Sequence, residues 1–194
     1  GDTAHLPYGT KSKETIIEYS MQICKFLINQ NVKLIIVACN TASALSIEIL
    51  EKNISIPIIN VIDPCIENAI QTTTKKSIGI IGTKATINSK AYEIKLKKIN
   101  KDLKIAAKAC PLFVPMIEEG LTDHTITNNI CKLYLDIKEF KTIDVLILGC
   151  THYPLLMDII KKHISNNITI INSANIVAIF VENFLHEKNI RTPI

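Results

Sequence analysis

Two cysteines, Cys39 and Cys150, stand at matching places in the chain, and their surroundings could support proton-transfer chemistry. Each ends a run of branched aliphatic residues and is followed within two residues by threonine, and the segments 32–41 and 143–152 share this pattern. A thiol acts as a base only when ionised, and the free N–H groups at a helix N-terminus stabilise the thiolate. Two matched thiols suit a reaction that needs similar groups on opposite sides of one substrate.

The aliphatic runs indicate the elements that position these thiols. Continuous apolar runs are typical of parallel strands buried on both faces, and ligands bind beyond the carboxyl ends of such strands. Apolar runs alternate with amphipathic stretches, which predicts an α/β fold with helices covering mainly parallel sheets. Strands are expected at 32–38, 56–62, 77–83, 105–110, 144–149 and 168–172. Helices are expected at 12–30, 41–52, 64–75, 86–99, 123–139, 155–165 and 174–188.

Composition excludes several classes of protein. The chain has 194 residues, of which 47% are hydrophobic, and a net charge of +4, too weak a positive charge for a typical nucleic-acid binder. No apolar run reaches the roughly 18–20 residues that span a bilayer, so we expect no membrane partner. The cysteines are scattered through apolar segments, which favours a reducing cytoplasm over a disulfide scaffold. Four of them are expected to be structural: Cys24, Cys65, Cys110 and Cys131.

His152 follows Cys150 by two residues and could act as a base toward a thiol or a substrate. It could equally cap local structure. A Cys-x-His pair can also belong to a metal site, but the sequence contains no second pair of metal-ligand spacing, so no metal is expected. Glu118 is either an ordinary surface carboxylate or a partner for this histidine.

Polar side chains gather where the predicted strands end. They could bind an anionic ligand together with helix N–H groups, or they could simply cap the helices that follow. These residues are Asn40, Thr41, Ser43, Thr83, Thr86 and Thr151. Near the start of the chain, Tyr8 and Gly9 follow a proline, which is typical of a tight turn and is also compatible with a ligand contact.

Three motifs carry a resemblance to a known family. GDTA at 1–4 leads to PYG at 7–9, ACNTAS occupies 38–43 and GCTHYPLL occupies 149–156. Together they resemble the glutamate racemases of the aspartate/glutamate racemase superfamily, and the last motif is very specific. Gly82-Thr83 and the segment 113–118 follow in the expected order, so the resemblance covers nearly the whole chain.

The resemblance implies a racemase that interconverts L- and D-glutamate without a cofactor and supplies D-glutamate for peptidoglycan in the cytoplasm. Cys39 and Cys150 would transfer protons, with His152 and Glu118 as auxiliary groups. The substrate site would comprise Tyr8, Gly9, Asn40, Thr41, Thr83, Thr86, Thr151 and His152. The resemblance also implies two similar α/β lobes around the active site, at 1–75 plus 168–194 and at 76–167. We expect glutamate as the small-molecule partner and a homodimer as a possible assembly.

The resemblance is incomplete at both ends of the chain. Family members carry an earlier strand ending in Asp-Ser-Gly, whose Asp assists the first cysteine, and no such residues precede Gly1 here. We therefore expect residues 1–194 alone to have little racemase activity. The alternatives are another thiol-using racemase, isomerase or decarboxylase of the superfamily, or a non-catalytic binding lobe. A thiol hydrolase would need one Cys–His pair and would leave Cys39 unexplained.

Overall fold

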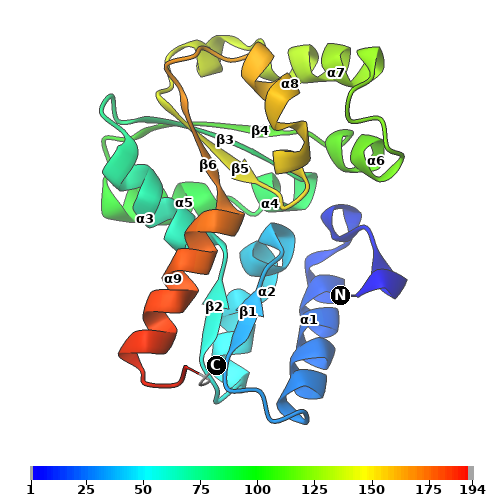
Figure 1. Cartoon of the computed structure of the whole chain (residues 1–194), viewed down its shortest axis with the longest axis vertical. Coiled ribbons are helices and arrows are strands. Elements are labelled where there is room, and N and C mark those ends of the chain that lie inside the picture. The colour runs from blue at the N-terminus through cyan, green and yellow to red at the C-terminus, as the bar shows by residue number, and fades with distance from the viewer. Residues whose placement is uncertain (1, 192–194) are drawn as a thin grey trace.

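A computed structural model describes residues 2–191, which form six strands in two parallel sheets (Figure 1). One sheet pairs β1 (Ile35–Val37) with β2 (Ile58–Asn60). The other has the order β4-β3-β5-β6, and its strands span Lys104–Ala109, Ser77–Gly82, Val145–Gly149 and Thr169–Asn172. Every pair is parallel, and each of the expected runs overlaps an observed strand, so the predicted α/β architecture is confirmed.

Helices connect these strands and differ in two places from the expected ones. The helix expected at 86–99 is divided at Lys90, whose φ of 55° interrupts the helical backbone, and a helix at 113–118 was not expected. The helices are α1 (Lys13–Ile28), α2 (Asn40–Asn53), α3 (Ile62–Thr72), α4 (Lys84–Asn88), α5 (Ala91–Ile99), α6 (Phe113–Glu118), α7 (Thr125–Leu135), α8 (Met157–Lys162) and α9 (Ser173–Glu187). Among residues 2–191, none of the helices has the length and apolar character needed to cross a bilayer.

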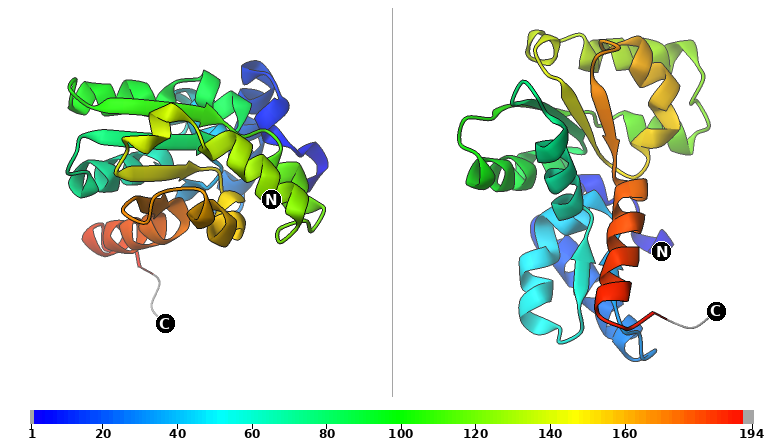
Figure 2. Two further views of the ribbon diagram at one scale, coloured as in Figure 1. Left: turned by 90° about the horizontal axis from the view of Figure 1, so that it is seen from above. Right: turned by 60° about the vertical axis from the view of Figure 1, so that its left-hand side comes forward.

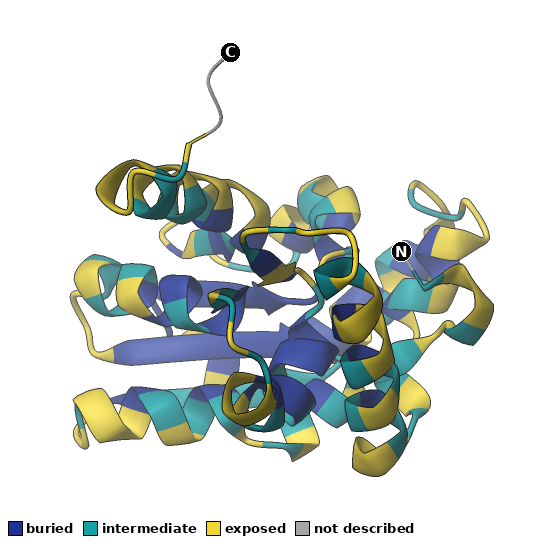
Figure 3. Cartoon of the chain, turned by 90° about the horizontal axis from the view of Figure 1, so that it is seen from below, coloured by how far each residue is buried: buried dark blue, intermediate teal, exposed yellow. Residues whose placement is uncertain are grey.

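The four-stranded sheet lies between two helical layers (Figure 2). Successive side chains of β5 point to opposite faces: Leu146 and Leu148 join a core with α6, α7 and α8, whereas Val145 and Ile147 join a core with α3 and α5. The central strands are therefore buried on both faces, as the aliphatic runs predicted (Figure 3). β1 departs from this prediction, because Ile36 is 43% exposed and β1 pairs only with β2 among the described residues.

The two-stranded sheet has its own core, in which α1 and α2 pack with β1 around Ile16, Ile35 and Leu50. From the end of β6, α9 runs back beside β2 (Figures 1 and 2). The expected lobe boundaries at 75 and 168 place α3 and β6 with β1 and β2, whereas α3 packs on the four-stranded sheet and β6 is its edge strand. The division into two lobes stays a prediction, and Gly1 and residues 192–194 lie outside the described residues.

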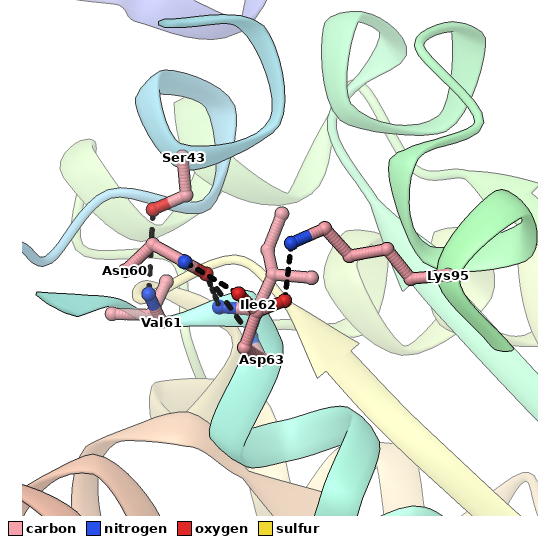
Figure 4. Close-up of polar contacts among 6 residues, drawn as sticks. All are labelled: Ser43, Asn60, Val61, Ile62, Asp63 and Lys95. Atoms are coloured by element: carbon pink, nitrogen blue, oxygen red, sulfur yellow. Dashed lines mark hydrogen bonds and ion pairs between the residues drawn. The ribbon is translucent and has the colours of Figure 1, made fainter. Parts of the chain in front are cut away.

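The chain passes from one sheet to the other at the end of β2, where polar contacts fix the joint (Figure 4). The Asn60 carboxamide accepts hydrogen bonds from the N–H groups that begin α3 and donates to Asp63 at 2.8 Å. Lys95 on α5 forms an ion pair with Asp63. The Ser43 hydroxyl on α2 accepts a hydrogen bond from the Val61 N–H at 3.4 Å. Side chains from α2, which packs on one sheet, and from α5, which packs on the other, thus hold this connection.

Candidate active site

Cys39 and Cys150 line one cavity of about 990 Å³. Cys39 is the N-cap residue of α2 and follows β1, whereas Cys150 directly follows β5. The two thiols therefore reach the cavity from the carboxyl ends of strands in different sheets. Cys39 is partly exposed, and Cys150 is only 6% exposed. The structure brings together the two cysteines that the sequence singled out, while their roles stay predictions.

Burial raises the pKa of both thiols, and for Cys150 the value reaches about 12. Backbone N–H groups oppose this effect at each sulfur: those of the first turn of α2 at Cys39, and those of His152 and Tyr153 at Cys150. The charge of an ionised Cys39 raises the pKa of Cys150 further, because the thiols share the cavity. Of the two cysteines, only Cys39 directly precedes an α-helix, because Cys150 leads into the short 3₁₀ turn Tyr153–Leu156.

His152 joins Cys150 to a carboxylate. Its Nδ1 lies 3.9 Å from the Cys150 sulfur, and its Nε2 lies 2.6 Å from Oε1 of Glu118, at the end of α6. With Nε2–H donating to Glu118, Nδ1 of the neutral ring is an acceptor directed at the thiol. His152 also precedes the 3₁₀ turn but makes no side-chain capping bond there. The contacts favour the proton-acceptor interpretation over the capping one.

Three threonine hydroxyls form a closed triangle beside Cys39. The oxygen atoms are 2.9 Å apart for Thr41 and Thr83, 3.2 Å for Thr41 and Thr86, and 3.0 Å for Thr83 and Thr86. Thr83 also caps α4 by accepting the Thr86 N–H, so it is a cap as well as a cavity-lining residue. Thr86 is 1% exposed and is not among the residues that line the cavity, but it supports Thr41 and Thr83, and its expected contact with substrate stays a prediction.

Asn40 also lines the cavity, and its amide has one partner only. The Tyr92 hydroxyl donates to Oδ1 at 2.6 Å, while Nδ2 is buried without a hydrogen-bond partner in the described part of the chain. Ser43, by contrast, is not among the residues that line the cavity, and its hydroxyl donates to the Val37 carbonyl at 2.8 Å. The sequence did not indicate Tyr92, because it is one aromatic residue on an ordinary amphipathic helix.

Tyr8 and Gly9 form a second wall of the cavity, in a 3₁₀ turn at Tyr8–Thr10. The Tyr8 hydroxyl donates to Asp2 at 2.6 Å, and the other oxygen of Asp2 lies 2.7 Å from Nδ1 of His5. A Cβ on Gly9 would lie 2.7 Å from Cβ of Thr83, so only glycine allows this approach. The turn is thus held by the hydrogen bond of Tyr8 to Asp2 and by the close packing of Gly9 on Thr83.

The remaining candidates complete the wall. Thr151 is exposed at the cavity, beside Cys150. The four cysteines expected to be structural are all buried free thiols: Cys24, Cys65, Cys110 and Cys131. Two of them, Cys24 and Cys110, contribute to the cavity wall, which the sequence did not indicate. Among residues 2–191, no three His, Cys, Asp or Glu side chains are grouped so that they could share a metal ion.

Comparison with known proteins identifies the family. Residues 2–180 match the family model described as Asp/Glu/Hydantoin racemase. The chain belongs to this family. It is 50% identical over 182 residues to a glutamate racemase of Persephonella marina, covering 94% of this chain and 70% of the relative. It is 42% identical over 193 residues to a glutamate racemase of Geobacter metallireducens, covering 100% of this chain and 72% of the relative.

A solved structure supports the same relationship within the Asp/Glu/Hydantoin racemase family. The crystal structure of glutamate racemase from Francisella tularensis in complex with D-glutamate has a TM-score of 0.93 and 38% identity. It covers 100% of this chain, which matches 72% of that protein. The span matched by the family model contains all the cavity residues described above, from Asp2 to His152. The family assignment therefore includes the site as well as the fold.

Proposed function

We propose that this protein interconverts L- and D-glutamate, with Cys39 and Cys150 transferring the Cα proton. The observation that carries the proposal is the pair of thiols on one cavity, each reaching it from a different sheet. Similarity to glutamate racemases at 50% and 42% identity supports glutamate as the substrate. An aspartate racemase of the same family is the alternative to be tested.

Racemisation needs two groups because the proton must leave from one face and return to the other. One thiolate takes the Cα proton and becomes a thiol, while the opposite thiol gives its proton to the carbanion and becomes a thiolate. The Cα–H bond breaks on one face, a new one forms on the other, and the net charge is unchanged. Each unit of pKa mismatch between the sulfur and Cα costs about 1.4 kcal/mol, so the site must also stabilise the carbanion.

Cys150 needs a group that accepts its proton, because its pKa of about 12 keeps it a thiol at neutral pH. His152 is in place for this role, since its Nδ1 lies 3.9 Å from the sulfur. The resulting imidazolium would be paired with the Glu118 carboxylate at 2.6 Å. Proton movement from Cys150 to His152 gives the thiolate that starts one direction of the reaction.

Hydrogen-bond donors along the cavity suit the carboxylate groups of an amino acid. Nδ2 of Asn40, which has no partner among the described residues, is such a donor, and the Thr151 hydroxyl can donate as well. The hydroxyls of Thr41 and Thr83 can donate to a ligand when they exchange a bond of their triangle for it. Donors on the α-carboxylate would stabilise the negative charge that develops when the Cα proton leaves. Tyr8 and Gly9 would close this side of the site around the substrate.

The wider setting follows from the same proposal. The reaction uses no pyridoxal phosphate and no metal, since the two thiols and their hydrogen-bond donors supply the chemistry described. We propose that it takes place in the cytoplasm and provides D-glutamate for peptidoglycan. A homodimer stays a prediction, to be measured by light scattering of the purified protein.

The test is racemisation by the full-length protein, followed by chiral chromatography from each enantiomer, with aspartate assayed in parallel. Cys39→Ser and Cys150→Ser should each abolish turnover, because a hydroxyl does not ionise near neutral pH. The buried Cys131→Ser is the matched control and should retain activity. Activity on aspartate alone would move the assignment to the alternative, and loss of activity on EDTA treatment with recovery by zinc would contradict the two-thiol chemistry.

The two serine variants also test the opposite-face geometry. Elimination of HCl from a chloro-substituted glutamate needs deprotonation from one face only, so each variant should act on one enantiomer. Cys39→Ser and Cys150→Ser should prefer opposite enantiomers. A shared preference would show that the thiols do not face the substrate from two sides.

A further inference from the structure

The Asn40 side chain is buried in an unusual state. It is 2% exposed, its oxygen accepts one hydrogen bond, and its Nδ2 is buried with no partner among the described residues, while Asn40 is one of the residues that line the cavity. A buried donor without a partner is unfavourable, because it has lost its hydrogen bonds to water. Such a group is expected to find its acceptor in a ligand of the cavity.

Tyr92 holds one end of this amide in the core. The phenol is 2% exposed and lies in the core between the four-stranded sheet and α3. Burial raises its pKa well above the ordinary value, so it keeps its proton at neutral pH. Its proton is given to Oδ1 of Asn40 at 2.6 Å, which leaves the NH₂ group without a hydrogen-bond partner among the described residues. In the flipped amide, that phenol proton would lose its acceptor.

We propose that Tyr92 is a positioning residue that fixes the Asn40 amide with its donor toward the ligand, and thereby selects a carboxylate. A carboxylate offers acceptors only, so it bonds well to an NH₂ group and poorly to an amide oxygen. The identity of that carboxylate as part of glutamate rests on the proposed function. The orientation of the amide rests on the contacts of Asn40 and Tyr92 alone.

The placement of Tyr92 makes the orientation rigid. Asn40 begins α2, whereas Tyr92 is the second residue of α5 and packs on the other sheet. The tyrosine ring is held by core packing, so its hydroxyl occupies one place relative to the four-stranded sheet. The hydrogen bond therefore couples the presentation of the amide to the docking of α2 against α5, an effect that no residue on α2 alone could provide.

The test is a double-mutant cycle in the full-length protein with Tyr92→Phe and Asn40→Ala. Tyr92→Phe should raise the Kd for D-glutamate and KM by about 5- to 30-fold, with a smaller change in kcat. In the Asn40→Ala background it should change the Kd by less than twofold, because it acts through that amide. Tyr134→Phe removes another largely buried phenol, in the opposite core, and should leave the Kd unchanged.

A second readout does not depend on the substrate. The side-chain NH₂ signals of Asn40, assigned by their loss in Asn40→Ala, should be sharp and dispersed in the ligand-free protein and should shift or broaden in Tyr92→Phe. Unchanged NH₂ signals, or equal losses of affinity in both backgrounds, would overturn the positioning role. A wild-type protein that does not bind or racemise glutamate would instead refute the proposed function, and the NH₂ signals would still decide the role of Tyr92.

Discussion

Glu118→Gln tests the proton path at Cys150 by removing one charge while keeping the size of the side chain. The carboxylate accepts the Nε2–H of His152 at 2.6 Å, and glutamine can still accept this bond. Hydrogen bonds to charged groups contribute about 1–1.5 kcal/mol more than neutral ones. Because the Glu118 side chain is 56% exposed, solvent screening reduces this to about 1 kcal/mol. We therefore expect about a fivefold decrease in kcat/KM.

The assay must account for the symmetry of the reaction. The two enantiomers have equal free energy, so kcat/KM falls equally in both directions in any variant. The asymmetry of the site should appear instead in isotope effects. When the substrate is the enantiomer whose Cα proton goes to Cys150, the isotope effect of deuterium at Cα on kcat/KM should be larger in Glu118→Gln than in the wild type. For the other enantiomer, the solvent isotope effect should increase, because Cys150 then donates a solvent-derived proton.

Glu119→Gln is the matched control, since this neighbouring carboxylate is exposed and does not line the cavity. It should leave kcat/KM and both isotope effects unchanged. The reasoning is refuted if Glu118→Gln behaves like this control. It is also refuted if the substrate isotope effect increases equally for both enantiomers, because the pair of His152 and Glu118 would then not act through Cys150.

Three further substitutions test the packing around the site. Gly9→Ala would place a Cβ 2.7 Å from Cβ of Thr83, so the turn must move away from that residue, and we expect about a tenfold higher KM. Gly149→Ala would place a Cβ 2.8 Å from the Ile81 carbonyl oxygen in the neighbouring strand, and urea unfolding should show a loss of about 1–3 kcal/mol. Asp144→Asn replaces a carboxylate that accepts four hydrogen bonds from residues 73–75 by a neutral amide. The free energy of unfolding should then fall by about 1–3 kcal/mol at pH 7. Burial opposes ionisation of Asp144, but the four hydrogen bonds outweigh burial and lower the pKa of this carboxyl group. The stability that ionised Asp144 contributes is therefore complete above the unfolded pKa of about 3.9, and it is lost as the pH falls through the folded pKa. The difference between variant and wild type should therefore shrink in acid, and a difference that persists at pH 2 would contradict the assignment.

The sequence predicts the strands well because their signal is local. Aliphatic runs such as 77–83 and 144–149 are explained by burial on both faces, and the structure buries every residue of β3 and β5. The lobe boundaries are harder to predict from the sequence, because they depend on which sheet a connecting helix packs against. Nothing in the sequence of α3 indicates that it covers the four-stranded sheet rather than β1 and β2.

The same distinction applies to the site. Cys39 and Cys150 could be found from the sequence because their position after a strand is a local property, and their shared cavity then follows from the fold. Tyr92 could not be found in this way, because its bond to Asn40 joins residues 52 positions apart on different elements. The supporting place of Thr86 is also a matter of side-chain direction, which the spacing from Thr83 leaves open.

The charge relationship between the two thiols gives a reason for building the cavity from two sheets. Burial raises the pKa of both, and ionised Cys39 raises that of Cys150 further, so removal of a second proton is harder than removal of the first. The cavity thus disfavours two thiolates at once, and removal of a single proton gives one thiolate and one thiol, the combination that the proposed transfer requires. Each turnover moves the negative charge from one sulfur to the other without changing its amount.

The negative charge needs stabilising groups at each of the two sulfurs. The end of each strand provides backbone N–H groups for the sulfur that follows it. Two cysteines on one strand would share one such group of donors and would face the substrate from one side. Strands from different sheets separate both the donors and the directions of approach. Activity should consequently fall at alkaline pH, where ionisation of the second thiol removes the proton donor, and pH profiles measured from each enantiomer should lose activity on that same limb.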